Sequence, residues 1–169
     1  MKIAICGKMC SGKTSLAKYI QKSESRFKIL SYGKKVKDIS TELFNMTKKD
    51  RTLIINVASK MREINPDVWS NYILKQSKDL EYCIIDDLRF QNELDGLMND
   101  ECDWIFIKLN ISKEIQEKRI KLLYPDNYQD HIKNNKHLSE QLNLDFKDKK
   151  VIHIDSHNEL DYKDILNQL

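Results

Sequence analysis

Short apolar runs alternate along the chain with segments whose apolar residues recur every three or four positions. Five of the runs are continuous enough to predict buried strands, at residues 2–6, 27–30, 82–85, 103–109 and 151–154. The spacing between them predicts helices over residues 14–22, 34–46, 53–61, 68–73, 94–98, 115–123, 138–143 and 158–168. Residues 124–136 are polar and aperiodic, which predicts a surface loop.

This alternation of strands and helices determines the predicted fold class. Strands that are apolar throughout are typical of a parallel sheet whose two faces are both covered by helices. With 169 residues, no repeat and no linker, the chain fits one domain spanning residues 1–169. We therefore expect an α/β protein with three layers and a five-stranded parallel sheet.

Composition and charge exclude several classes of protein. No apolar run approaches the roughly 20 residues of a membrane span, so no membrane partner is expected. The formal net charge is +3, from 29 basic and 26 acidic residues, which gives no support for a stable nucleic-acid complex. The four Cys form no Cys-x-x-Cys pair, so we expect reduced thiols in a cytoplasmic protein.

The most specific motif lies between the first predicted strand and the first predicted helix. It fits Gly-x-x-x-x-Gly-Lys-Ser/Thr at every fixed position, in the strand–helix context that this P-loop motif requires. The amides of such a loop and the start of its helix bind phosphate oxygens, which predicts ATP as the ligand. Lys13 is expected to reach the β- and γ-phosphates and Thr14 to ligate Mg²⁺. The predicted ATP-binding residues here are Gly7, Lys8, Met9, Cys10, Ser11, Gly12, Lys13, Thr14 and Ser15.

A second candidate site lies where the third predicted strand ends in Asp86 and Asp87. A carboxylate at this place in a P-loop protein holds Mg²⁺, although a strand can also simply end at a polar turn. Arg89 follows, and it could either grip a phosphate or pair with a neighbouring acid. Arg119, on the helix that leads into the polar loop, could close over the transferring phosphate or lie on a solvated helix face.

Six stretches, taken in order along the chain, carry a resemblance to a known family. They are the P-loop, Ser31-Tyr32-Gly33-Lys34-Lys35-Val36-Lys37-Asp38, Ala58-Ser59-Lys60-Met61-Arg62 with Pro66-Asp67-Val68-Trp69, Asp87-Leu88-Arg89-Phe90-Gln91-Asn92-Glu93, His137-Leu138-Ser139-Glu140 and Ser156-His157-Asn158. Together they resemble the deoxynucleoside monophosphate kinases of phages and large DNA viruses. The sequence departs from the family at Ala58, where glycine is frequent, and in a lid that has lysines in place of arginines.

The resemblance implies a kinase that transfers the γ-phosphate of ATP to the 5′-phosphate of a (deoxy)nucleoside monophosphate. It implies a P-loop NTPase fold with a monophosphate-binding region at about residues 32–75 and a small mobile lid at about 120–137. Because the related enzymes often dimerise, the resemblance also implies a possible homodimer. It implies a location in the host cytoplasm if the chain is viral.

The same resemblance assigns roles to individual residues. Asp87 would hold Mg²⁺, with Asp86 as its alternate, because strand periodicity makes Asp86 the first acid at the strand end. The residues expected to contact ATP outside the P-loop are Arg119, Ser156 and Asn158. The residues expected to bind the substrate are Lys37, Arg62, Trp69, Asp87, Arg89, Glu93 and His137, although Trp69 also fits a place in the core. The expected catalytic residues are Lys13, Asp87, Arg89 and Arg119.

Other functions remain open at the level of sequence. Dephospho-coenzyme A kinases and phosphomevalonate kinases share the expected architecture and differ in the acceptor. A nucleotide-binding switch protein would instead carry Asn-Lys-x-Asp, and Asp-x-x-Gly after the Mg²⁺ strand, and neither pattern occurs. A nucleic-acid end kinase would need a basic channel, which the balanced charge does not support.

Overall fold

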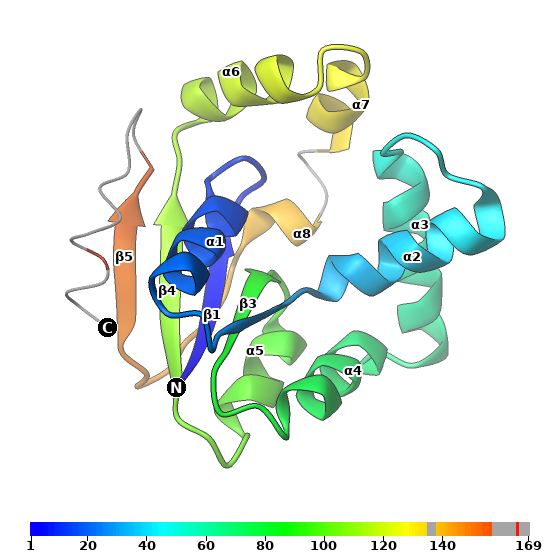
Figure 1. The fold of residues 1–169 in the computed structure, drawn as a ribbon. Helices are drawn as coiled ribbons and strands as arrows, with labels where there is room; N and C mark the ends of the chain where they lie inside the picture. The colour runs from blue at the N-terminus through cyan, green and yellow to red at the C-terminus, as the bar shows by residue number, and fades with distance from the viewer. Residues whose placement is uncertain (135–137, 157–164, 166–169) are drawn as a thin grey trace.

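A parallel sheet of five strands forms the centre of the protein (Figure 1). The computed structural model describes residues 1–134, 138–156 and 165. The strand order is β2-β3-β1-β4-β5, and every neighbouring pair is parallel. The strands are β1 (Lys2–Gly7), β2 (Lys28–Leu30), β3 (Cys83–Leu88), β4 (Trp104–Asn110) and β5 (Val151–Asp155). The predicted α/β fold with a five-stranded parallel sheet is confirmed.

Helices cover both faces of the sheet, because successive side chains of each strand point to opposite sides. In β1, Ile3 and Ile5 pack with α1 (Lys13–Ser23) and with Ile165. Ala4 and Cys6 point to the other face, where α4 (Val68–Ser77) and α5 (Gln91–Met98) supply much of the core. The result is the three-layer arrangement that the apolar strands predict.

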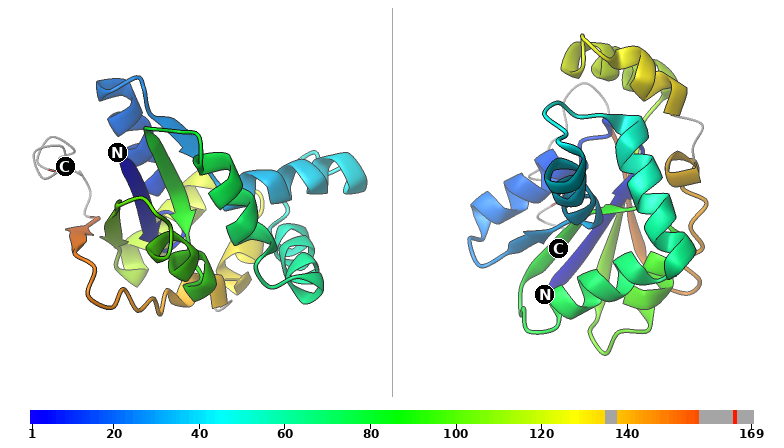
Figure 2. Two further views of the ribbon diagram at one scale, coloured as in Figure 1. Left: turned by 90° about the horizontal axis from the view of Figure 1, so that it is seen from below. Right: turned by 90° about the vertical axis from the view of Figure 1, so that its right-hand side faces the viewer.

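Further helices lie around the carboxyl ends of the strands, where the loop between β1 and α1 also lies (Figure 1). The helices α2 (Tyr32–Phe44) and α3 (Arg51–Ile64) extend to one side of the sheet, away from β5 (Figure 2). The helices α6 (Lys113–Leu123) and α7 (Tyr128–Lys133) pass over the same end, and we call these two the lid helices. The short helix α8 (Leu138–Gln141) lies below them.

The prediction of a surface loop over residues 124–136 is wrong in part. Residues 128–133 form α7, and the side chain of His131 is fully buried. Its ring lies against Tyr124, with 4.1 Å between the ring centroids. A polar segment can therefore be held in place by one buried aromatic contact, which periodicity does not reveal.

Several element ends also differ from the predictions. The helix expected over residues 34–46 begins at Tyr32, because the hydroxyl of Ser31 accepts a hydrogen bond from the amide of Lys34. Asp67 stands at the start of α4, but its side chain caps nothing there and accepts instead from Asn92 Nδ2 at 2.9 Å. The strand expected at residues 82–85 continues through both aspartates to Leu88. Of the helix expected at residues 158–168, only residue 165 lies within the described part.

The helices that the structure describes include none both long and apolar enough to span a lipid bilayer.

Candidate functional site

The P-loop curls at the carboxyl end of β1 and leads directly into α1. Gly12 has φ +99°, a backbone conformation that a side chain would strain. At Gly7, a Cβ atom would lie 2.8 Å from the carbonyl oxygen of Leu109, so glycine is needed there for close packing against β4. These two glycines let the loop curl tightly ahead of α1, so that the start of this helix faces the space in which a phosphate chain would bind.

Lys13 crosses the P-loop and binds its own backbone. The Nζ atom donates to the carbonyl oxygens of Gly7 at 2.6 Å and Lys8 at 2.7 Å. Burial, together with the positive charge of Arg89, lowers the pKa of Lys13 to about 7. An anionic phosphate beside the ammonium group would stabilise its charged form.

The two neighbouring aspartates of β3 face different partners. The hydroxyl of Thr14 donates to Asp86 Oδ2 at 2.7 Å, so Asp86 lies at the P-loop. Asp87 accepts from the hydroxyl of Ser31 and from the amides of Tyr32 and Gly33, at 2.7–2.8 Å. Asp87 therefore anchors the start of α2.

Asp86 also has the features of a cation ligand. Its Oδ1 atom is buried and has no hydrogen-bond partner among the described residues. Burial and the nearby Asp87 raise the pKa of the Asp86 carboxyl above its ordinary value. A carboxylate and a hydroxyl are oxygen ligands of the kind that Mg²⁺ accepts, so Asp86 and Thr14 fit this ion.

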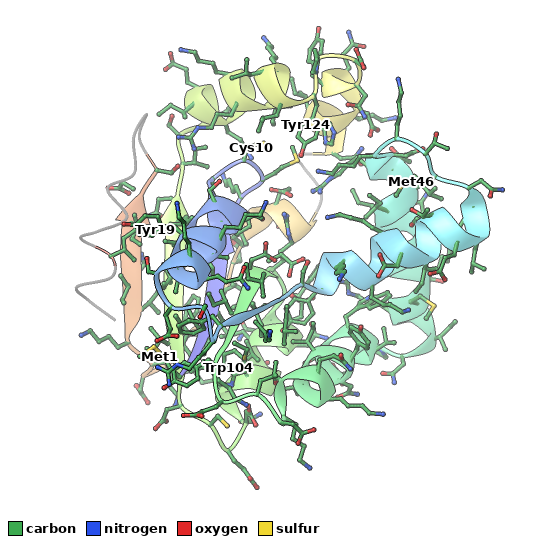
Figure 3. All side chains as sticks on the ribbon, viewed as in Figure 1. Met1, Cys10, Tyr19, Met46, Trp104 and Tyr124 are labelled. Atoms are coloured by element: carbon green, nitrogen blue, oxygen red, sulfur yellow. The ribbon has the colours of Figure 1, made fainter. Side chains whose placement is uncertain are left out.

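A cavity of about 520 Å³ opens between the P-loop, α2, α3 and the lid helices. Cys10 of the P-loop and Tyr124 of the lid both line it and lie near each other in Figure 3. The predicted site residues that line it are Met9, Cys10, Gly12, Lys13, Thr14, Ser15, Lys37, Arg62, Trp69, Asp86, Asp87, Arg89, Glu93 and Arg119. One cavity thus brings together the predicted ATP and substrate residues.

A few predicted residues fall elsewhere. Gly7, Lys8 and Ser11 belong to the loop but do not line the cavity. Ser156 is buried, and its hydroxyl accepts from Arg119 at 2.7 Å. His137 and Asn158 lie outside the described residues.

Arg62, Phe90 and Trp69, which all line the cavity, combine a cation with aromatic rings. The guanidinium of Arg62 lies 4.0 Å from the ring centroid of Phe90 and 3.4 Å from Glu93 Oε1. The indole of Trp69 donates to the carbonyl oxygen of Ala58 at 3.2 Å and is only 3% exposed. Trp69 is thus a core residue with one edge at the cavity.

Glu93 has a structural role in addition to its place at the cavity. Its Oε2 atom accepts from the amides of Arg89 and Phe90, at 3.0 and 3.1 Å, which satisfies donors at the start of α5. Burial raises the pKa of Glu93 to about 7.

The lid helices are tied to the rest of the site by side chains. Arg119 donates to the carbonyl oxygen of Cys10 at 3.1 Å as well as to Ser156. Lys49 donates to the hydroxyl of Tyr124 at 2.8 Å. Asp130 accepts from the amide of Arg51 and the hydroxyl of Thr52 at the start of α3. The lid helices are therefore hydrogen-bonded to both the P-loop and α3.

Sequence reasoning missed Arg51 and Glu140. Arg51 Nη2 lies 2.5 Å from Glu140 Oε1, and Arg89 Nη1 donates to the same oxygen. The amide of Met9 donates to Glu140 Oε2 at 2.7 Å. Glu140 belongs to the His137-Leu138-Ser139-Glu140 stretch, which was the available signal, whereas no motif marks Arg51.

A protein-family model described as an AAA domain matches residues 3–143, which is most of the chain. The chain belongs to this AAA domain family. A search of curated proteins found no significant match.

Solved structures with the same fold include kinases. A gluconokinase from Sinorhizobium meliloti 1021 is 14% identical with a TM-score of 0.60, and the match covers 99% of this chain and 87% of that one. A putative kinase from Chloroflexus aurantiacus J-10-fl is 13% identical with a TM-score of 0.63, covering 99% and 92%. A shikimate kinase from Aquifex aeolicus VF5 is 18% identical with a TM-score of 0.52, covering 99% and 95%. At these sequence identities, the comparison shows that this AAA domain protein shares the fold of these structures.

Proposed function

We propose that the chain is a nucleoside monophosphate kinase, which transfers the γ-phosphoryl group of ATP to the 5′-phosphate of a (deoxy)nucleoside monophosphate. One observation carries the proposal: the cavity that the P-loop lines is also lined by Lys37, Arg62 and Arg89, which are cations from outside that loop. Such cations suit an acceptor that is itself a phosphate. The aromatic and apolar lining beside them suits a nucleoside.

The donor side would hold the ATP phosphates with the P-loop amides, Lys13 and the start of α1. Asp86 and Thr14 would hold Mg²⁺, which would neutralise charge on the transferring phosphate oxygens when bound. We assign Asp86 to this role in preference to Asp87, because the three hydrogen bonds that Asp87 accepts commit its carboxylate to α2.

The acceptor side would act by orientation and charge. The 5′-phosphate is already anionic, so the transfer needs no general base, and the protein contributes positioning and electrostatic stabilisation. Arg62 and Arg89 would orient this phosphate for in-line attack. Arg119 and the lid helices would exclude water and so suppress hydrolysis of ATP.

The structural neighbours suggest a second candidate, a kinase that phosphorylates a hydroxyl group. Two of them are a gluconokinase and a shikimate kinase. A hydroxyl acceptor requires a carboxylate or another base near the attacking oxygen. Three carboxylates among the described residues line the cavity, and Asp86 is assigned to Mg²⁺ above. Asp87 already accepts from Ser31, Tyr32 and Gly33, and Glu93 from the amides of Arg89 and Phe90, which weakens this candidate.

An acceptor panel separates these functions. Release of ADP from ATP–Mg²⁺ would be followed with dNMPs, NMPs, dephospho-coenzyme A, phosphomevalonate, gluconate and shikimate. The proposal expects turnover with at least one nucleoside monophosphate, at a rate that Lys13→Ala abolishes. Turnover with a hydroxyl acceptor and none with any monophosphate would contradict it.

A further inference from the structure

The carboxylate of Glu140 lies at the centre of a buried charge cluster. Its side chain is 1% exposed, and it receives Arg51 and Arg89 on one oxygen and the amide of Met9 on the other. Burial alone would raise the pKa of this carboxyl, but the two arginines and the Met9 amide outweigh burial, so its pKa lies below the ordinary value. Glu140 is therefore a buried anion between two guanidinium groups.

The cluster connects parts of the site that are distant in sequence. Arg51 begins α3, Arg89 follows β3, and Met9 belongs to the P-loop. Two guanidinium groups at one place repel each other, and a buried pair of cations is stable only with a compensating anion. Because one oxygen of Glu140 binds both arginines and the other binds the P-loop, the arginines are held at a fixed position relative to the ATP site.

The Nε–H group of Arg51 is available as a hydrogen-bond donor to a ligand. Its side chain is 10% exposed and lines the cavity, and its Nε atom has no hydrogen-bond partner among the residues that the structure describes. A buried N–H without a partner is costly unless a ligand satisfies it. A phosphate oxygen in the cavity would satisfy it with a charge-assisted hydrogen bond.

We infer that Glu140 is a positioning residue that holds Arg51 and Arg89 against the P-loop, and that Arg51 binds the phosphoryl group being transferred. The inference rests on the proposed function, since it assigns both residues to a phosphoryl transfer. Glu140 itself touches no substrate. It acts by keeping the two guanidinium groups in place before ATP binds, so that their ordering costs nothing during the reaction.

The test uses a mimic of the γ-phosphoryl group, so that it does not depend on the identity of the acceptor. Calorimetry would measure the affinity of the chain for ADP–Mg²⁺ with and without beryllium fluoride. We expect beryllium fluoride to tighten binding to the native chain by about tenfold or more, and Arg51→Ala and Glu140→Gln to lose most of that gain. Binding of ADP–Mg²⁺ alone should change less than about threefold in Arg51→Ala, which leaves the P-loop and its contact with Glu140 intact.

Chemical rescue distinguishes positioning from a general structural role. Added guanidinium ion should restore part of the gain in Arg51→Ala, because Glu140 still offers a binding site for it, but not in Arg51→Ala/Glu140→Gln. Glu63→Gln is the matched control, because this exposed glutamate on α3 pairs only with Lys60 among the described residues. If Glu140→Gln does not fold, Glu140→Asp tests the same point, since its shorter side chain cannot reach both the arginines and Met9.

The outcomes separate the two proposals. An unchanged beryllium fluoride gain in folded Arg51→Ala or Glu140→Gln would overturn the inference, as would equal rescue with and without Glu140. If the native chain shows the gain but phosphorylates no nucleoside monophosphate, the proposed acceptor is wrong and the inference about Glu140 stands.

Discussion

The two ends of the cavity are built in different ways. At the donor end, the P-loop and its helix lie in consecutive residues, and Lys13 is held by the carbonyl oxygens of its own loop. At the other end, which α3, α8 and the lid helices form and which we call the lid end, Arg51 and Glu140 meet across 89 residues of sequence, and Lys49 and Tyr124 across 75. Glu140 joins this end to the P-loop through the amide of Met9. The P-loop depends on local backbone geometry, whereas the lid end depends on side chains that only the complete fold brings together.

This difference predicts which property, activity or stability, a substitution at each end should change. A substitution at the donor end should remove chemistry and spare the fold. A substitution at the lid end should disturb stability, positioning or both, because the same side chains perform both tasks.

The largest effect is expected from Lys13→Ala. It removes the ammonium group that would bind the transferred phosphate, so kcat should fall by about a thousandfold or more. The melting temperature should stay the same or rise, because a buried amine whose pKa is lowered to about 7 is itself costly. Lys18→Ala, at an exposed position of the same helix, is the control. A kcat near the native value, or loss of the fold, would contradict the assignment.

The paired variants Asp86→Asn and Asp87→Asn should have different effects, the first on catalysis and the second on stability. Asp86→Asn should lower kcat by about a hundredfold and raise the Mg²⁺ concentration needed for half-maximal rate, with little loss of stability. Asp87→Asn should lower the free energy of unfolding by about 1–2 kcal/mol, because it weakens the start of α2. Magnesium titrations and urea denaturation of both variants check this, and the reverse pattern would restore Asp87 as the metal ligand.

Arg62→Met should affect acceptor binding alone. Removing one cation from the acceptor wall should raise KM for the nucleoside monophosphate by about tenfold to thirtyfold, while KM for ATP stays within about twofold. Lys60→Met, an exposed cation two residues away on α3, is the matched control. Equal changes in both KM values would show that Arg62 supports the whole cavity rather than the acceptor phosphate.

The smallest effect concerns the pH dependence of the lid. Burial, with the charges of Lys49 and Arg51, lowers the pKa of His131 to about 4, from an ordinary value of 6.5. The unfolded chain therefore binds a proton that the folded chain excludes, and stability falls as the pH drops from 6.5 towards 4. The loss attributable to His131 should be about 1 kcal/mol between pH 6.5 and 5.5.

Denaturation at several pH values would measure this loss. His131→Phe should remove that part of the pH dependence, whereas His153→Phe, at an exposed position of β5, should leave it in place. The same slope in the native chain and in His131→Phe would mean that other groups cause it.

The fold could be predicted because each strand and helix is encoded by its own stretch of sequence. The five strands and the P-loop follow from patterns within about a dozen residues. The helix at residues 128–133 could not be predicted in this way, since His131 is buried by a contact with Tyr124 rather than by an apolar pattern.

The site could likewise be predicted only where its residues belong to a local sequence pattern. The sequence identifies the P-loop and both aspartates, but only the structure separates their partners, because neighbouring strand residues point to opposite sides. Glu140 lies in a stretch that the family resemblance marks, but neither its sequence context nor that of Arg51 indicates that the two form an ion pair, because a charge carries no sequence signal of its partner.

Identification of the product tests the central claim most directly. ³¹P NMR would follow the native chain with ATP–Mg²⁺ and the dNMPs and NMPs. The account predicts that the single monophosphate resonance is replaced by the coupled α and β resonances of a nucleoside diphosphate, as ADP accumulates. Unchanged monophosphate resonances for every nucleotide, with ATP intact or hydrolysed only to inorganic phosphate, would contradict it.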